Sequence, residues 1–140
     1  ETSHVIPALM RKFHEAKRLQ EDEVDVWGSG SPLREFLHVN DLVSAIFFTM
    51  QNINAIDIYS KDISHINIGS GEEISIKELA YLIIKIIGFQ GNVNFNDSMP
   101  DGTPRKVLDS SFLNESGWTS KIELRHGLES LYSWYKENQL

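Results

Sequence analysis

The sequence predicts an α/β protein, because segments that alternate like strands and segments with helical spacing follow one another along its 140 residues. Residues 24–27 alternate between apolar and polar side chains, as a half-buried strand does. The opening segment instead places Val5, Leu9 and Phe13 on one face of a helix. With 41% hydrophobic and 24% charged residues, the chain can bury one core. We therefore expect residues 1–140 to form a single region.

Turn and cap residues divide the chain into its elements. In order, we expect a helix at 4–20, a strand at 24–27, an extended piece at 34–39, a helix at 41–50, a polar linker at 51–64, a buried strand at 65–68, a helix at 76–87, a strand at 93–95, a loop at 99–106, and helices at 110–116 and 124–138. Ser3 is placed to cap the first helix, which tolerates Pro7 near its start. The polar turn at 28–32 ends the first strand. Asn40 or Asp41 can cap the helix that follows.

The later helices have equally clear signals. The helix at 41–50 is apolar on nearly every face, so we expect neighbours to cover it on more than one side. Further along, Ser75 and Glu78 have the spacing of a capping box that opens a helix. Gly88 ends that helix, and another glycine ends the short helix after it. Leucines at helical spacing form one stripe on the last helix, where we expect it to meet the core.

The composition excludes several classes of function. A formal net charge of −7 argues against sequence-independent binding of nucleic acid, although a few cations suffice for a ligand with two phosphates. There is no cysteine and no H-E-x-x-H motif, so we expect no metal site, and the lack of cysteine suits a cytoplasmic protein. No apolar run approaches the roughly 20 residues of a membrane-spanning helix. The chain starts without an initiator Met or a signal sequence, and we expect it to be part of a longer protein.

Two kinds of short motif match the patterns of dinucleotide-binding or catalytic sites only in part. Residues 69–71 (Gly-Ser-Gly) stand between a strand and a helix, as the phosphate-binding turn of a dinucleotide fold does. The third glycine of G-x-G-x-x-G would fall at Ile74, however, and residues 28–30 repeat the short pattern before a proline. Tyr-x-x-x-Lys occurs at 81–85 and 132–136, but such a pair is common on any helix. We interpret the glycine pairs as turns and the tyrosine–lysine pairs as ordinary helix residues.

Other side chains can bind a ligand or transfer a proton. His4 stands at the start of a helix, where the helix dipole lowers the pKa of an imidazolium and favours a neutral ring; a surface histidine without a chemical role is the alternative. Trp27 can stack on a base or sugar and Arg34 can hold a diphosphate, unless they are a core tryptophan and a surface ion pair. The loop from Asp101 to Lys106 combines prolines with adjacent cations, which favours an anion-binding loop over a core element.

Five stretches carry a resemblance to a known family. They read SHVIPAL at 3–9, VWGSG at 26–30, REFLHVND at 34–41, HINIGSG at 65–71 and PDGTPRK at 100–106. In this order they resemble the GDP-L-fucose synthase family of the extended short-chain dehydrogenase/reductase superfamily, and they extend over essentially the whole chain. REF and the N-x-G-x-G turn are shared by many nucleotide-sugar epimerases and dehydratases, whereas HVIPA and DGTPRK point to the fucose branch.

The resemblance implies an architecture. The chain would be the C-terminal, substrate-binding portion of an extended short-chain dehydrogenase/reductase, as one region over 1–140. One helix and one strand within about 40–70 would complete the absent Rossmann domain and would be exposed or re-packed here. The family's glycine-rich turn and its Tyr-x-x-x-Lys pair lie upstream of the segment that matches His4. The resemblance therefore implies that the parent protein uses NADP(H), while this chain alone binds no cofactor and is inactive.

The resemblance also implies a reaction and a set of site residues. The reaction is epimerisation of GDP-4-keto-6-deoxy-D-mannose at C3 and C5, followed by reduction of the C4 ketone with NADPH to give GDP-L-fucose. Protons beside a ketone are acidic because the enolate is delocalised, so a positioned acid and base can invert both centres. His4 would be the catalytic acid and would also lie beside the cofactor. The residues implied to bind the GDP-sugar substrate are Lys12, Trp27, Arg34, Asp101 and Lys106, with Arg34 and Lys106 near the diphosphate. The parent protein would be a homodimer.

Two alternatives remain open. One is a non-catalytic nucleotide-binding or protein-interaction module. The other is a related nucleotide-sugar epimerase or dehydratase that acts on a different sugar, against which the loop at 101–106 argues. A glycine-rich strand–turn–helix encoded upstream would distinguish the enzyme from the module.

Overall fold

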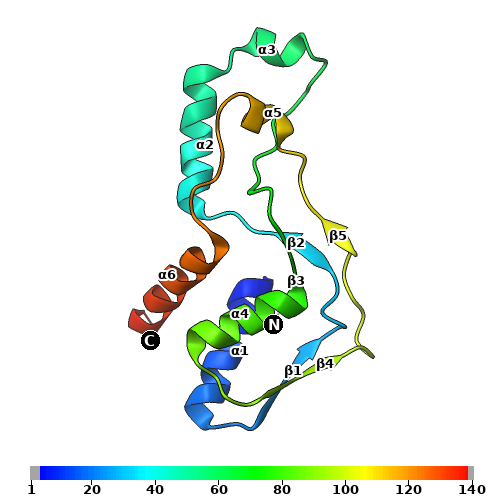
Figure 1. Ribbon diagram of the computed structural model, residues 1–140, viewed down its shortest axis with the longest axis vertical. Coiled ribbons are helices and arrows are strands. Elements are labelled where there is room, and N and C mark those ends of the chain that lie inside the picture. The colour runs from blue at the N-terminus through cyan, green and yellow to red at the C-terminus, as the bar shows by residue number, and fades with distance from the viewer. Residues whose placement is uncertain (1–3, 139–140) are drawn as a thin grey trace. The chain divides into compact units, whose positions relative to one another are not determined.

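The helices and strands follow one another in an α/β order, which confirms the fold class expected from the sequence. A computed structural model describes residues 4–138. The elements in chain order are α1 (Val5–Leu19), β1 (Glu23–Trp27), β2 (Leu33–Glu35), α2 (Val39–Asn52), α3 (Ala55–Tyr59), β3 (Glu73–Ser75), α4 (Ile76–Ile87), β4 (Asn92–Asn96), β5 (Arg105–Lys106), α5 (Ser111–Glu115) and α6 (Leu124–Glu137) (Figure 1).

The chain divides into two units, each with its own core. Unit 1 contains the chain up to Arg34, residues Ile74–Arg105 and the chain from Arg125 onward, and unit 2 contains Glu35–Glu73 and Lys106–Leu124. The strands β2, β3 and β5 each include a point where the chain passes from one unit to the other. They form a sheet in the order β3-β2-β5.

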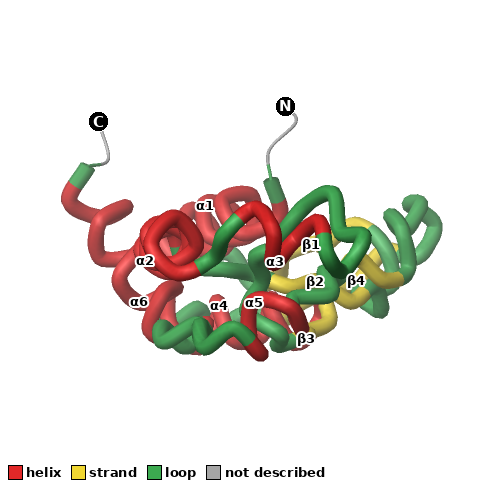
Figure 2. Tube along the Cα trace, turned by 90° about the horizontal axis from the view of Figure 1, so that it is seen from above, coloured by secondary structure: helices red, strands yellow, loops and turns green. Residues whose placement is uncertain are grey.

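Unit 1 is organised around two parallel strands. β1 pairs with β4 from Glu23↔Asn92 to Trp27↔Asn96, and Figure 2 shows the two strands together. Helices α1 and α4 pack against each other, and α1 also packs against β1 (Figure 1). Alternate residues of β1 are buried, so its two valines enter the core while Trp27 lies on the opposite face. The side chains that α1 and α4 bury are Leu9, Met10, Phe13, Ala16, Leu79, Ala80, Ile83 and Ile87.

Local contacts fix both ends of α4, as the sequence predicts. The Ser75 hydroxyl accepts from the Glu78 N–H at 3.1 Å, and Glu78 Oε2 accepts from the Ser75 N–H at 3.0 Å. Gly88 ends the helix with φ 75°, a left-handed conformation that strains residues with a side chain. Lys17 of α1 donates to the Ile87 carbonyl at 2.6 Å and so satisfies an acceptor of the last turn.

Unit 2 has a smaller core between α2, α5 and the chain after α5. Ala45, Leu113 and Trp118 are buried together, and the Trp118 Nε1–H donates to Ser44 Oγ at 3.2 Å. The partly buried side chains packed on this cluster are Leu37, Phe48, Ile53, Ile66 and Ile68.

Much of the apolar surface of α2 is exposed. Asp41 and Ala45 are its buried residues, and they lie one turn apart on one face. The large apolar side chains that it exposes are Val39, Leu42, Val43, Ile46, Phe47 and Met50. The described residues therefore cover α2 on one side, not on several as its apolar pattern predicts. No helix in the described part of the chain is long and apolar enough to cross a membrane.

The buried strand expected at 65–68 is not formed. No strand of the described chain pairs with this segment. Ile66 and Ile68 instead pack on the unit 2 core, and the Asn67 side chain donates to the Asp109 carbonyl at 3.0 Å. Apolar residues predict burial correctly here, but a strand also needs a neighbour for its hydrogen-bond ladder.

Two helix caps differ from those expected. His38 caps α2 in place of Asn40 or Asp41, because its Nδ1 accepts from the Asn40 N–H at 3.2 Å. Asp41 lies inside the first turn of that helix. At α1 the cap position belongs to His4, whose side chain makes no cap hydrogen bond, and the expected cap Ser3 lies outside the described residues.

In three segments the amount of regular secondary structure differs from the prediction. The linker at 51–64 contains the short helix α3, where the Asn54 N–H donates to Asp57 Oδ2 at 2.9 Å. The extended piece expected at 34–39 forms a strand only as far as the end of β2. The loop at 99–106 ends in β5. Short elements of this kind carry too few residues for a periodic signal.

Candidate functional site

Two loops begin side by side at one edge of the β1–β4 pair. Trp27 ends β1 opposite Asn96, which ends β4. Loop A (residues 28–32) follows β1, and loop B (residues 97–104) follows β4. Because the strands are parallel, both loops leave from the carboxyl ends of the strands, the edge where α/β proteins bind ligands.

Backbone hydrogen bonds join the loops at both ends. The Gly28 N–H donates to the Asn96 carbonyl at 2.9 Å, where the loops begin. The Leu33 N–H donates to the Pro104 carbonyl at 2.8 Å, where they end. The two loops, which lie about seventy residues apart in sequence, therefore run together in unit 1.

Asp101 binds loop A with both carboxylate oxygens. Its Oδ1 accepts from the Ser29 N–H at 2.9 Å, and its Oδ2 accepts from the Ser29 hydroxyl at 2.7 Å. Gly28 makes this approach possible, since a Cβ at that position would lie 2.3 Å from Asp101 Oδ1. Sequence reasoning did not identify Ser29, because a serine in a Gly-Ser-Gly turn is an ordinary turn residue.

Arg34 of β2, the strand that follows loop A, binds loop B. Its Nη1 donates to the Thr103 and Leu33 carbonyls, each at 2.7 Å. A Cβ at Gly102 would lie 3.1 Å from Arg34 Nη2, so the guanidinium passes close to the loop backbone. Arg34 thus donates to carbonyl groups where the alternative interpretation expected a surface ion pair. Its remaining N–H groups, on Nε and Nη2, can form the paired hydrogen bonds that a phosphate accepts.

Trp27 is an exposed aromatic side chain next to these contacts. Its exposed fraction is 70%, so the alternative interpretation as a core tryptophan is wrong. Trp27 directly precedes loop A, and Asp101 touches the next residue, Gly28. The structure therefore brings Trp27, Arg34 and Asp101 to one pair of adjoining loops. An indole face, a guanidinium and a carboxylate are groups that can bind a base, a diphosphate and a hydroxyl.

The other predicted site residues do not belong to loops A and B. Lys12 of α1 donates from its ammonium to the Asp25 carbonyl in β1, two residues before Trp27. His4 is exposed at the start of α1 in unit 1. Lys106 is exposed in β5 and is the first residue of its segment of unit 2.

The glycine turn at 69–71 does not offer a phosphate cradle. The Gly71 N–H donates to Glu35 Oε1 at 2.6 Å, and a Cβ at Gly69 would lie 2.4 Å from the same oxygen. Glu35 Oε2 also accepts from the Leu108 N–H at 3.0 Å. A carboxylate thus occupies the place that a dinucleotide phosphate would need. The described residues do not fit NADP(H) at this turn, in agreement with the interpretation of the motif as a plain turn.

The Tyr-x-x-x-Lys matches behave as structural residues. Tyr132 is buried in unit 1, where its hydroxyl lies 3.1 Å from His14 Nδ1, and burial raises its phenol pKa, with a smaller effect of Tyr135 in the same direction. A catalytic phenol needs the opposite shift. Lys136 lies over the Tyr132 ring, 5.0 Å from its centroid. Tyr81 stands edge-on to the ring of Phe95.

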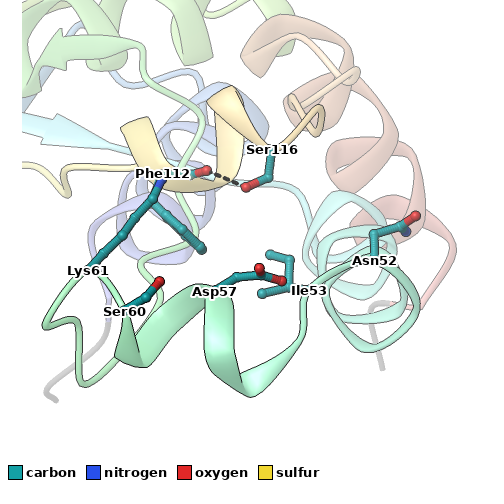
Figure 3. Close-up of a pocket in the computed structure, with 7 residues that line it drawn as sticks. All are labelled: Asn52, Ile53, Asp57, Ser60, Lys61, Phe112 and Ser116. Carbon is teal, nitrogen blue, oxygen red and sulfur yellow. Dashed lines mark hydrogen bonds between the residues drawn. The ribbon is translucent and has the colours of Figure 1, made fainter.

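Unit 2 contains a separate small cavity of about 260 Å³ (Figure 3). Lys61 lies 5.0 Å from the centroid of the Phe112 ring there, and the Ser116 hydroxyl donates to the Phe112 carbonyl at 2.7 Å. None of the predicted site residues lines this cavity. Among the described residues there is also no group of three potential metal ligands.

Comparison with known proteins shows which proteins the chain is similar to. Residues 1–69 match the NAD dependent epimerase/dehydratase family. Over 138 residues the chain is 52% identical to probable GDP-L-fucose synthase 1 of Oryza sativa subsp. japonica, an alignment that covers 99% of this chain and 40% of that protein. It is 48% identical over 139 residues to GDP-L-fucose synthase of Escherichia coli (strain K12), with coverage of 98% and 43%. The chain is thus similar to proteins of the NAD dependent epimerase/dehydratase family and to GDP-L-fucose synthases.

The architecture of a solved structure agrees with that of this chain. GDP-mannoheptose C4 reductase from Campylobacter jejuni, solved with NADP bound, matches with a TM-score of 0.85 and 42% identity over 97% of this chain and 46% of that one. The α/β fold is thus that of an extended short-chain dehydrogenase/reductase. The chain spans about 40% of the length of the curated family members it matches.

Proposed function

We propose that this chain is the GDP-sugar-binding part of an NADP-dependent GDP-L-fucose synthase. The parent protein would convert GDP-4-keto-6-deoxy-D-mannose to GDP-L-fucose by epimerisation and reduction. NADPH would supply the hydride for the reduction. The 140-residue chain alone would bind no cofactor and would be inactive, because its described residues offer no phosphate-binding turn for a dinucleotide.

The observation that carries the proposal is that Asp101 of loop B bonds to loop A and Arg34 of β2 bonds to loop B, with the exposed Trp27 directly before loop A. The exposed indole would stack on guanine or ribose, and the free edge of the Arg34 guanidinium would hold the diphosphate. Lys12 and Lys106 would add positive charge. Asp101 has capacity for about two further hydrogen bonds beyond those from Ser29, enough for a sugar hydroxyl.

His4 would be the catalytic acid of the epimerisation and would lie beside the cofactor. Removal of a proton next to the C4 ketone gives an enolate, and inversion requires a proton to return to the opposite face. A histidine at the exposed start of α1 can deliver that proton.

The elements within about 40–70 would complete the cofactor domain of the parent protein. The exposed apolar side chains of α2, such as Phe47 and Met50, support this. The parent would act in the cytoplasm as a homodimer.

Calorimetric titration with GDP tests the proposal on the full-length gene product that contains this sequence. Arg34→Ala should weaken GDP binding by about 10- to 100-fold, since it removes a charged partner of the diphosphate. Arg125→Gln is the matched control, because this arginine pairs with Glu129 on the surface of α6. UDP should bind more weakly than GDP. The absence of GDP binding to the wild type would overturn the proposal.

A related sugar is the second candidate. The 42% identity to a GDP-mannoheptose C4 reductase favours the same nucleotide and the same C4 reduction on a different sugar. Turnover of GDP-4-keto-6-deoxy-D-mannose in D₂O separates the two. Deuterium at C3 and C5 of the product indicates epimerisation, whereas its absence at both carbons indicates a simple reductase.

A further inference from the structure

We infer that Ser29 is a positioning residue of the GDP-sugar site. Its hydroxyl joins loop A to Asp101 of loop B and thereby holds in place Trp27 and Arg34, which stand on either side of loop A. The identity of the ligand rests on the proposed function. The contact between the loops does not depend on which ligand binds.

The Ser29 hydroxyl uses its full hydrogen-bonding capacity. A serine hydroxyl has one donor and two acceptor positions. It donates to Asp101 Oδ2 at 2.7 Å and accepts from the Ser31 N–H at 3.1 Å. Ser31 Oγ lies 2.7 Å away. It must be the donor in that contact, because the single hydroxyl proton of Ser29 is already donated to Asp101. One hydroxyl therefore sets the turn of loop A and attaches it to loop B.

Besides the backbone hydrogen bonds at their ends, two contacts made by side chains hold the loops together, and each involves a proposed ligand-binding residue. At one point the Ser29 backbone and hydroxyl bind Asp101. At the other, Arg34 Nη1 binds the Thr103 carbonyl. When the Ser29 hydroxyl is removed, the Asp101 carboxylate keeps a single bond to loop A. The loops then sample other arrangements, and a ligand that needs the joined arrangement binds more weakly in proportion to the population lost.

Substitution of Ser29 in the full-length gene product tests the inference. Ser29→Ala should raise the Kd for GDP and the KM for the keto-sugar by about tenfold, the effect of one hydrogen bond to a charged group. The kcat at saturating substrate should stay within about twofold, since Ser29 lies in the nucleotide-binding loops. Ser29→Thr keeps the hydroxyl and should restore both constants. Ser116→Ala is the matched control, because its hydroxyl donates to the Phe112 carbonyl outside both loops.

Trypsin cleavage without ligand gives an independent readout. Ser29→Ala should speed cleavage after Arg105 and Lys106, which directly follow loop B, severalfold relative to wild type, Ser29→Thr and Ser116→Ala. Equal cleavage rates, or equal loss of affinity in Ser29→Thr and Ser29→Ala, would overturn the positioning role. If the wild type fails to bind GDP, the proposed function is refuted while the cleavage rates still decide whether Ser29 joins the loops. If Arg34→Ala weakens binding and Ser29→Ala does not, the function stands and the role of Ser29 is refuted.

Discussion

Replacement of Asp41 with alanine is a sharp test of how unit 2 is held together. The Asp41 side chain is only 4% exposed. Its Oδ2 accepts from the Lys121 N–H at 3.1 Å and from the Ile122 N–H at 2.9 Å. The carboxylate therefore joins the first turn of α2 to the segment before α6, and its removal leaves two backbone donors without their partner.

The two bonds set the expected magnitude. A hydrogen bond to a charged acceptor contributes about 1.5–3 kcal/mol, so loss of both should lower the free energy of local opening by about 3 kcal/mol. This corresponds to exchange of the two amides that is faster on the order of 100-fold. Asp41→Asn should cost less, because both N–H groups bond the same oxygen and an amide oxygen can accept both. Loss of the charge alone should give about a tenfold change.

Native-state hydrogen exchange measures the effect directly at the amides of Lys121 and Ile122. The amides of β4 in unit 1 provide the internal reference, and Asp97→Ala, which removes an exposed carboxylate from the turn after β4, provides the control variant. Unchanged exchange at Lys121 and Ile122 in Asp41→Ala would show that the carboxylate does not hold this segment.

Three further predictions concern unit 1. Gly88→Ala should lower the free energy of unfolding by about 1 kcal/mol in urea denaturation, because φ 75° strains any residue with a Cβ; an unchanged midpoint would contradict this. Hydrogen bonds from the Ser75 side chain, then its backbone, lower the pKa of Glu78 from its ordinary 4.5. This cap should therefore stabilise α4 above pH 4.5 and be lost as the pH falls further, and Glu78→Gln should remove that pH dependence of α4 amide exchange. Burial raises the Tyr132 pKa above 10.0, so the contribution of the neutral phenol to stability is complete below that pH and is lost as the phenol ionises. Absorbance titration should show one phenol that ionises at a higher pH than the others and that is absent in Tyr132→Phe.

The sequence predicts elements well where local chemistry alone determines them. The Ser75–Glu78 box and Gly88 mark both ends of α4 because a helix end is completed by residues within one turn of it. Alternation places β1 correctly, since Val24 and Val26 need only one apolar face to pack on. The segment at 65–68 shows the limit of this reasoning. Its isoleucines are partly buried as expected, but whether a strand forms depends on a neighbour that the segment itself does not encode.

The sequence indicates which residue types form the candidate site, but not which groups they contact. Trp27, Arg34 and Asp101 stand out in the sequence because their side chains suit a nucleotide ligand. Their partners do not stand out. Arg34 binds the Thr103 carbonyl, which every residue type offers, and Asp101 binds a turn serine about seventy residues away. Only the parallel register of β1 and β4 places these groups together.

The glycines of the two loops show how the fold leaves room for this connection. In the sequence, Gly28 and Gly102 mark turns. In the structure a functional side chain approaches each of them, since a Cβ would meet Asp101 Oδ1 at Gly28 and Arg34 Nη2 at Gly102. A side chain at Gly28 would also be strained, because φ is 82° there. The loops can therefore approach closely enough for Asp101 to bind loop A and for Arg34 of β2 to bind loop B, and the exposed Trp27 directly precedes loop A.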